Sequence, residues 1–141
     1  GYYRELKEAI VRKSLQKRFR LHPAAHNVVP LYHEADAVCL PSFHEGTSNV
    51  ICEAMACGIP VLASRVSDTP RLVKEGRNGW LFDPSSPQDI ANVIMRFADT
   101  SPDVRRTMGK EGRKMAESIF SPALFANRFI KLIDQVSTRR H

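Results

Sequence analysis

Long apolar runs are absent from this sequence of 141 residues, and none approaches the roughly twenty apolar residues that a membrane-spanning helix needs. Internal repeats and low-complexity segments are absent as well. The chain starts at Gly1 rather than Met, so we expect a piece of a longer protein. Hydrophobic residues make up 43% and charged residues 26%, a composition that suits a globular domain with a core of its own.

Cysteine occurs only three times, at Cys39, Cys52 and Cys57, so the thiols cannot all pair with one another. No C-x-x-C pair is present, and no histidine lies at a spacing that suggests a zinc site. All three cysteines stand in apolar stretches. We therefore predict reduced core residues in a cytoplasmic protein.

The net charge is +6, and basic residues gather in residues 4–20 and 105–114. Aromatic residues are not interleaved with them, as stacking on single-stranded nucleic acid would require, so we expect no nucleic-acid partner. A solvated basic face is the simplest interpretation. Contact with an anionic membrane surface is the alternative.

Residues 41–61, PSFHEGTSNVICEAMACGIPV, indicate a loop, a helix and a turn between two strands. Gly46 permits a tight turn, and Thr47, Ser48 and Asn49 are residue types that begin helices. A helix that opens after a parallel strand directs its free N–H groups and its positive dipole end to the carboxyl edge of the sheet. Phosphate groups bind at such places.

Periodicity predicts helices that alternate with strands along the chain. Helices are expected at 2–14, 27–35, after 48, at 70–74, from 87, at 102–118 and from 122. Strands are expected at 18–22, 37–40, 60–63 and 79–82. This order predicts an α/β fold, with a parallel sheet and helices on both faces.

Two carboxylates flank the expected helix start. Glu45 lies in the loop before the helix, and Glu53 lies five residues past Ser48, about 7.5 Å along the axis. A diphosphate at the helix N-terminus would have one acid on each side, and each acid could accept hydrogen bonds from sugar hydroxyls. For an arbitrary pair of glutamates, a solvated helix surface and a loop cap are the commoner explanation. The surrounding residues therefore decide.

Those residues resemble family 4 retaining glycosyltransferases, whose pattern P-S-x-x-E-G-x-x-x-x-x-x-E-A-M-A-x-G-x-P-V is filled at every fixed position from Pro41 to Val61. The resemblance continues at 75–81, EGRNGWL, like the family's E-G-x-N-G-x-L, and at Asp83-Pro84. It covers residues 32–100 well. It implies a GT-B enzyme, in which residues 1–141 form the latter part of the Rossmann-like, C-terminal donor-binding domain.

The resemblance also implies roles for single residues. Glu45 would bind hydroxyls of the transferred sugar and is the candidate catalytic residue, while Glu53 would hold the ribose hydroxyls. The implied donor-binding residues are Gly46, Thr47, Ser48, Asn49 and Glu53. The implied reaction is hexosyl transfer from a nucleotide-diphosphate sugar with retention of configuration, as in polysaccharide biosynthesis. We expect His44 to line the donor cleft rather than to act as a base.

We predict no metal and no cofactor besides the donor substrate. Asp36 and Asp68 do not form the D-x-D pattern that holds a metal in nucleotide-sugar transfer. Backbone N–H groups and basic side chains would then neutralise the departing diphosphate. One departure from the family lies near the expected donor site. Where the family usually has Gly-Gly and then Glu, this chain has Ser67, Asp68 and Arg71, which bears on the sugar or base that is recognised.

The implied partners are a nucleotide-sugar donor, a saccharide or lipid-linked acceptor, and an N-terminal domain or chain that is missing here. Peripheral contact with the cytoplasmic membrane face is expected if the acceptor is lipid-linked. In the family, the basic clamp on the pyrophosphate lies upstream of this segment, so we expect the isolated chain to be inactive. Two alternatives stay open: the donor-binding half of a split enzyme, and a non-catalytic nucleotide-binding or interaction module.

The family's strand order, 3-2-1-4-5-6, gives a test of the sheet. Strands 37–40, 60–63 and 79–82 should be neighbours, and no ladder should join 18–22 to 37–40. Uncovered strand edges would make the isolated piece poorly stable. In the family the last helix crosses back to the other domain, and we expect the same of the apolar stripe Leu124, Phe125, Phe129, Leu132, Ile133 and Val136.

Overall fold

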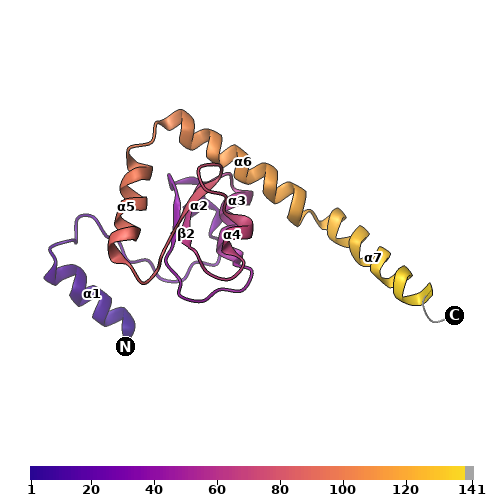
Figure 1. Cartoon of the computed structure of the whole chain (residues 1–141). Coiled ribbons are helices and arrows are strands. Elements are labelled where there is room, and N and C mark those ends of the chain that lie inside the picture. Colours follow the sequence, from indigo (N-terminus) through magenta and orange to yellow (C-terminus); the bar gives the residue numbers. More distant parts are fainter. Residues whose placement is uncertain (139–141) are drawn as a thin grey trace.

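The computed structural model describes residues 1–138 of the chain as an α/β body from which one long helix projects (Figure 1). The helices are α1 (Tyr2–Arg12), α2 (Val29–His33), α3 (Asn49–Ala56), α4 (Thr69–Leu72), α5 (Pro87–Ala98), α6 (Pro102–Phe120) and α7 (Pro122–Thr138). The strands are β1 (Val38–Leu40), β2 (Val61–Ser64) and β3 (Gly79–Phe82). Three of the helices begin at a proline, which suits the first helical turn because its missing N–H has no acceptor there.

The strands form one parallel sheet in the order β1-β2-β3. Val38 lies opposite Val61, and Val61 lies opposite Gly79. The prediction that 37–40, 60–63 and 79–82 are neighbours is therefore confirmed. Every residue of β2 and β3 is buried, as the continuous apolar runs of a covered parallel sheet require.

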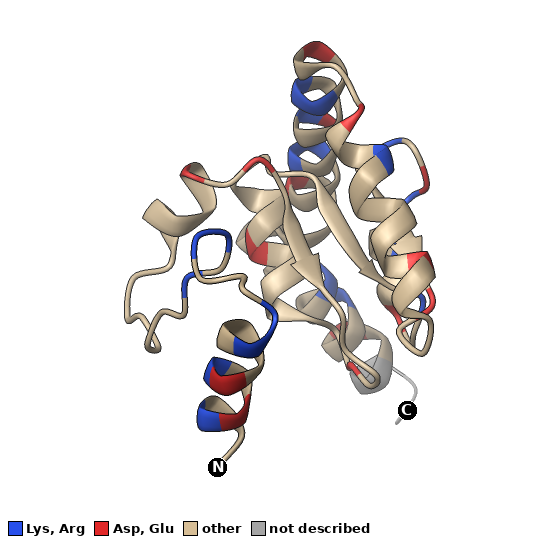
Figure 2. Cartoon of the chain, turned by 90° about the vertical axis from the view of Figure 1, so that its left-hand side faces the viewer, with Lys and Arg blue, Asp and Glu red and all other residues tan. Residues whose placement is uncertain are grey.

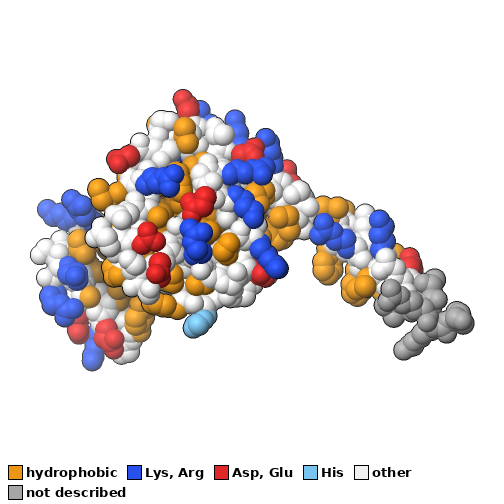
Figure 3. Space-filling view, viewed as in Figure 1, with side chains coloured by type: hydrophobic (Ala, Val, Ile, Leu, Met, Phe, Trp, Pro, Cys, Tyr) orange, Lys and Arg blue, Asp and Glu red, His pale blue; other side chains and the backbone are white. Residues whose placement is uncertain are grey.

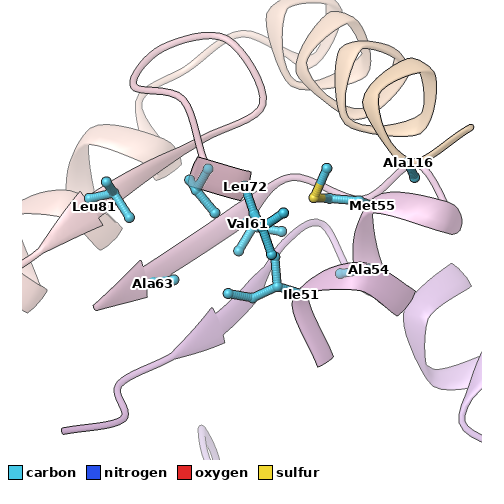
Figure 4. Close-up of a cluster of buried hydrophobic side chains, with 9 residues drawn as sticks. Ile51, Ala54, Met55, Val61, Ala63, Leu72, Leu81 and Ala116 are labelled. Atoms are coloured by element: carbon cyan, nitrogen blue, oxygen red, sulfur yellow. The ribbon is translucent and has the colours of Figure 1, made fainter. Parts of the chain in front are cut away.

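Alternate residues of the strands face two separate cores. On one side, Val61 and Ala63 of β2 pack with Ile51 and Met55 of α3, and with Leu81 of β3 (Figure 4). On the other side, Leu62, Trp80 and Phe82 pack with Val93 and Phe97 of α5 and with Met108 of α6. Helices thus cover both faces of the sheet, which confirms the predicted fold class.

Helix α6 packs against α3 through small residues rather than through the apolar residues that periodicity indicates. Helical periodicity predicts Val104, Met108, Met115 and Ile119 on its buried side. Met108 is buried and Met115 partly buried, but Val104 and Ile119 are exposed. The buried residues of α6 are Met108, Gly109, Gly112 and Ala116. A Cβ built on Gly109 would lie 2.0 Å from the Gly58 carbonyl oxygen, so only glycine allows this close approach.

The predicted strand at 18–22 is wrong. Residues 16–18 form a turn and 19–22 have no regular structure. Within residues 1–138, no strand lies beside this segment, and a strand without a hydrogen-bonded neighbour does not form. The expected absence of a ladder between 18–22 and β1 is confirmed. Helix α1 forms as predicted, but only its Ile10 is buried, and Leu31 of α2 is exposed rather than inward-facing.

The cysteines are free thiols, as predicted, but they are not core residues. Cys39 is exposed, and Cys52 and Cys57 are partly buried. Cys39 lies on β1, which pairs only with β2 within residues 1–138 and so forms an edge of the sheet.

Helix α7 points away from the body, continuing from the end of α6 (Figure 1). Its apolar side chains remain largely in solvent (Figure 3), with Phe125 69% and Phe129 53% exposed. The side chain of Val136, which was predicted to belong to this stripe, lies outside the described part. An apolar stripe of this width, left uncovered, is typical of a surface that packs against another domain or chain.

Candidate functional site

The N-terminus of α3 lies at the carboxyl edge of the sheet, directly after β1 and an eight-residue loop, 41–48. Ser48 is the N-cap residue and Asn49 the first helical residue, as the sequence predicts. The Ser48 side chain makes no capping hydrogen bond. In contrast, Ser86 caps α5 and Ser101 caps α6 through their hydroxyl oxygens. The first N–H groups of α3 therefore lack the side-chain acceptor that the other two helices have.

The loop before α3 presents its candidate residues to solvent. Gly46, Thr47 and Asn49 are exposed, Glu45 is half-buried, and Ser48 is buried. Among the described residues, no hydrogen bond or ion pair holds the Glu45 carboxylate. The backbone bends at residues 46–47, as expected, but φ at Gly46 is not positive and open space surrounds the position of a Cβ. Nothing inside the described chain requires glycine at this position.

Glu53 lies on the exposed side of α3, one turn beyond the helix start. Its Oε2 accepts a hydrogen bond of 2.8 Å from the hydroxyl of Tyr32, which lies on α2. The apolar residues that surround Glu53 in the sequence predict that it is partly buried and needs a partner. The carboxylate has a partner, although the residue is exposed. Sequence spacing does not predict that Tyr32 and Glu53 meet, because α2 comes before β1 along the chain and α3 comes after it.

A hollow of about 500 Å³ lies between α3 and the junction of α6 with α7. Glu53 and Cys52 of α3 line it, together with Arg113 and Phe120 of α6. Arg113 also donates to the Ala56 carbonyl oxygen in the last turn of α3. The hollow includes Glu53 but neither Glu45 nor the start of α3. The structure therefore brings Glu53 beside a mainly apolar hollow and leaves the helix start on open surface.

The second motif segment, 75–79, is held by hydrogen bonds to other parts of the chain. The Asn78 side chain is fully buried; it donates to the Leu72 carbonyl oxygen at 2.9 Å and accepts from the Lys74 N–H at 2.7 Å. Glu75 accepts from Arg65 at 2.8 Å and from the Leu81 N–H at 3.2 Å. These contacts shape the turn that leads into β3.

The loops after β2 and β3 lie at the carboxyl edge of the sheet, as the start of α3 does, and they too are held by contacts within the chain. Ser67 follows β2 with φ 46°, the left-handed conformation that glycine adopts without strain. Asp68 forms an ion pair of 3.2 Å with Arg71 across the first turn of α4. After β3, the Ser85 hydroxyl and N–H both donate to Asp83, which lowers the pKa of that carboxyl.

Within residues 1–138, no three His, Cys, Asp or Glu side chains are grouped so that they could hold a metal ion. That the reaction needs no metal stays a prediction. The helices of this same part are too short or too polar to cross a membrane. His44, expected in the cleft, is exposed next to Glu45.

Comparison with known families decides the relationship. The model for Glycosyl transferases group 1 matches residues 1–100, more than two thirds of the chain. The chain belongs to this family. Among curated proteins, D-inositol 3-phosphate glycosyltransferase from Streptomyces scabiei is 37% identical over 101 residues, which are 72% of this chain and 22% of the relative. The chain thus spans about a fifth to a third of the length of such relatives.

Solved structures with about 30% sequence identity share the fold of this chain. Sucrose-phosphate synthase from Thermosynechococcus elongatus matches with a TM-score of 0.84 and 30% identity, over 96% of this chain and 34% of that one. The Anabaena protein HepE in complex with UDP matches with a TM-score of 0.89 and 27% identity, over 95% of this chain and 37% of that one. The same protein was also solved with UDP-glucose.

The match to HepE also bears on α7. The match to HepE leaves out only 5% of the chain, which is fewer residues than α7 contains. Most of the projecting helix therefore has a structural counterpart in that protein.

Proposed function

We propose that this chain is the donor-binding part of a glycosyltransferase that moves a hexose from a nucleotide-diphosphate sugar to an acceptor, with retention of configuration and without a metal. The observation that carries the proposal is the open start of α3. Its first N–H groups lack a side-chain cap and lie at the carboxyl edge of a parallel sheet, with Glu45 before them and Glu53 after them. That arrangement suits a diphosphate with a sugar on each side.

In this proposal Glu45 binds hydroxyls of the transferred sugar and acts as the catalytic residue. Glu53 accepts hydrogen bonds from the ribose. The backbone N–H groups of Gly46, Thr47, Ser48 and Asn49 face the sugar and the diphosphate. As the glycosidic bond breaks, the sugar acquires oxocarbenium character and the diphosphate takes up negative charge, which preorganised N–H groups stabilise.

The comparisons support a nucleotide-sugar as the donor, because HepE, at 27–28% identity, was solved with UDP and with UDP-glucose. The open space around Gly46 supports the same idea, since a ligand can approach the backbone where no side chain stands. The base and the sugar that this chain prefers are left to experiment.

The proposal assigns sugar transfer to a longer protein. The acceptor domain and the basic clamp on the diphosphate belong to segments outside these 141 residues, and the exposed apolar stripe of α7 would pack on that other part. The expected setting is the cytoplasm. Exposed basic residues on α6 (Figure 2) would favour contact with an anionic membrane if the acceptor is lipid-linked.

Nuclear magnetic resonance of the labelled chain tests donor binding without the missing parts. UDP, UDP-glucose and the diphosphates of the other nucleosides are titrated, and the amide signals of residues 46–51 are followed. We expect saturable shifts there for at least one nucleotide, and smaller ones for inorganic pyrophosphate, which lacks the ribose. Shifts confined to other regions, or no shifts with any nucleotide, would contradict the proposal.

Glu53→Gln tests the ribose assignment. We expect it to weaken nucleotide binding by about 1–3 kcal/mol, the range for hydrogen bonds to a charged group. Glu117→Gln is the matched control, because Glu117 lines the same hollow from α6. Equal affinities for the two variants would remove the basis for assigning the ribose to Glu53.

A further inference from the structure

Tyr32 makes a contact that the proposed function does not use. Its hydroxyl donates to Oε2 of Glu53 at 2.8 Å, across 21 positions of sequence. Among the described residues, no other hydrogen bond or ion pair reaches the Glu53 side chain. The orientation of this exposed carboxylate therefore depends on a single neighbour.

The Tyr32 ring is held in place by packing. It is half-buried and packs against the core cluster formed by α3 and β2. The backbone is tied down too, because the Tyr32 N–H donates to the Val28 carbonyl oxygen at 3.2 Å. A tyrosine has few rotatable bonds, so an anchored ring places its hydroxyl at a defined point.

The hydroxyl is a donor over the whole neutral range. Burial, and then the hydrogen bond to the Glu53 carboxylate, raise the pKa of Tyr32 to about 12. A phenol with that pKa stays protonated at neutral pH. Its proton is directed at Oε2 whenever the carboxylate is ionised.

The contact leaves enough acceptor capacity for a ligand. An ionised carboxylate offers about four acceptor positions, and Tyr32 occupies one. The two vicinal hydroxyls of a ribose need two. A glutamate side chain that is ordered before binding also loses less conformational entropy when the ligand arrives.

We propose that Tyr32 is a positioning residue, whose hydroxyl holds the Glu53 carboxylate in the orientation that accepts hydrogen bonds from the two ribose hydroxyls of the nucleotide. The inference rests on the proposed function, since it takes Glu53 as the ribose ligand. The competing explanation is a structural tether, in which the same bond only fastens α2 to α3.

Tyr32→Phe separates the two explanations, because it keeps the packed ring and removes only the hydroxyl. UDP and 2′,3′-dideoxy-UDP are titrated into the full chain, and unfolding by urea is measured in parallel. Tyr3→Phe is the matched control, on an exposed tyrosine of α1. We expect Tyr32→Phe to weaken UDP binding about three- to tenfold, within the coupling range for residues in contact. Binding of the dideoxy nucleotide should not change.

A double-mutant cycle completes the test. In the Glu53→Gln background, Tyr32→Phe should have no further effect on UDP binding. If Glu53→Gln weakens binding but Tyr32→Phe only lowers the free energy of unfolding, the bond is a tether and the positioning role is overturned. Equal losses for UDP and the dideoxy nucleotide would overturn it as well. If Glu53→Gln itself changes nothing, the ribose assignment fails and the positioning role fails with it.

Discussion

The two motif segments that identify this chain differ in what they do. In residues 75–79, the pattern side chains are bonded within the chain: Asn78 is buried with two hydrogen bonds, and the exposed Glu75 joins Arg65 to the backbone of β3. In residues 45–53, the pattern residues have few contacts within the chain, and Glu53 has its one hydrogen bond from Tyr32. Among the described residues, Glu45 has no partner and Gly46 has only open space around it.

The difference separates two reasons why a residue type is required. A residue that is bonded and packed inside the chain is required by the fold. A pattern residue with no internal contact is required by something outside the chain, and for this sheet edge that is the proposed donor. Substitutions should therefore divide in the same way: those at Asn78 and Gly79 should lower stability, and those at Glu45 and Gly46 should lower ligand binding.

The largest expected effect is that of Gly79→Ala. A Cβ at this position would lie 1.8 Å from the Val61 carbonyl oxygen, so β2 and β3 would have to separate. We expect a loss of about 3 kcal/mol or more in the free energy of unfolding, measured with urea. The same exchange at Gly46 is the control. A loss below 1 kcal/mol at Gly79 would show that the sheet yields more easily than its close approach implies.

Asn78→Ala should have the next largest effect. It removes two buried hydrogen bonds and leaves the Lys74 N–H and the Leu72 carbonyl oxygen without their partner. We expect a loss of about 2–3 kcal/mol, the cost of leaving buried polar groups unsatisfied. Asn49→Ala, on the exposed start of α3, should change stability by less than about 0.5 kcal/mol. If the two losses are equal, residues 75–79 and 45–53 do not differ in their importance for the fold, and the comparison fails.

Elements with strong local signals could be predicted from the sequence. Short apolar runs located the three strands of the described residues, and prolines 87, 102 and 122 marked three helix starts. The failures depend on partners that are distant in sequence. Residues 18–22 have strand-like alternation but no neighbouring strand, and α6 buries Gly109 and Gly112, which hydrophobic periodicity does not weigh.

Only part of the candidate site could be predicted from the sequence. The start of α3 and the positions of Glu45 and Glu53 follow from the resemblance and from helix-start chemistry. Tyr32 could not be found in this way, because no local pattern tells which side chains meet when two helices flank a strand. The internal role of Asn78 was likewise invisible, since a buried amide and a ligand-binding amide have the same sequence signature.

Gly46→Ala should be nearly neutral for stability and harmful for binding. Nothing lies within 4 Å of a Cβ built there, and the backbone is not in the left-handed region. We expect a change below about 0.5 kcal/mol in the free energy of unfolding. If a sugar or diphosphate approaches this backbone, the added methyl group should weaken UDP-glucose binding measurably. Unchanged binding would place the ligand elsewhere on the sheet edge.

Ser67→Gly has the smallest expected effect and tests a residue between the two segments. Ser67 adopts φ 46° in the loop after β2, where the resembled family has glycine. Relief of left-handed strain, about 1–2 kcal/mol for an L-residue, is partly offset by the greater entropy of glycine in the unfolded chain. We expect a net gain of about 0.5 kcal/mol by urea unfolding, with Ser67→Ala as the control that keeps the Cβ and gains nothing. A gain with unchanged UDP affinity would assign the position to the fold, as for 75–79. A change in affinity without a gain in stability would show instead that this loop belongs with 45–53 and contacts the donor.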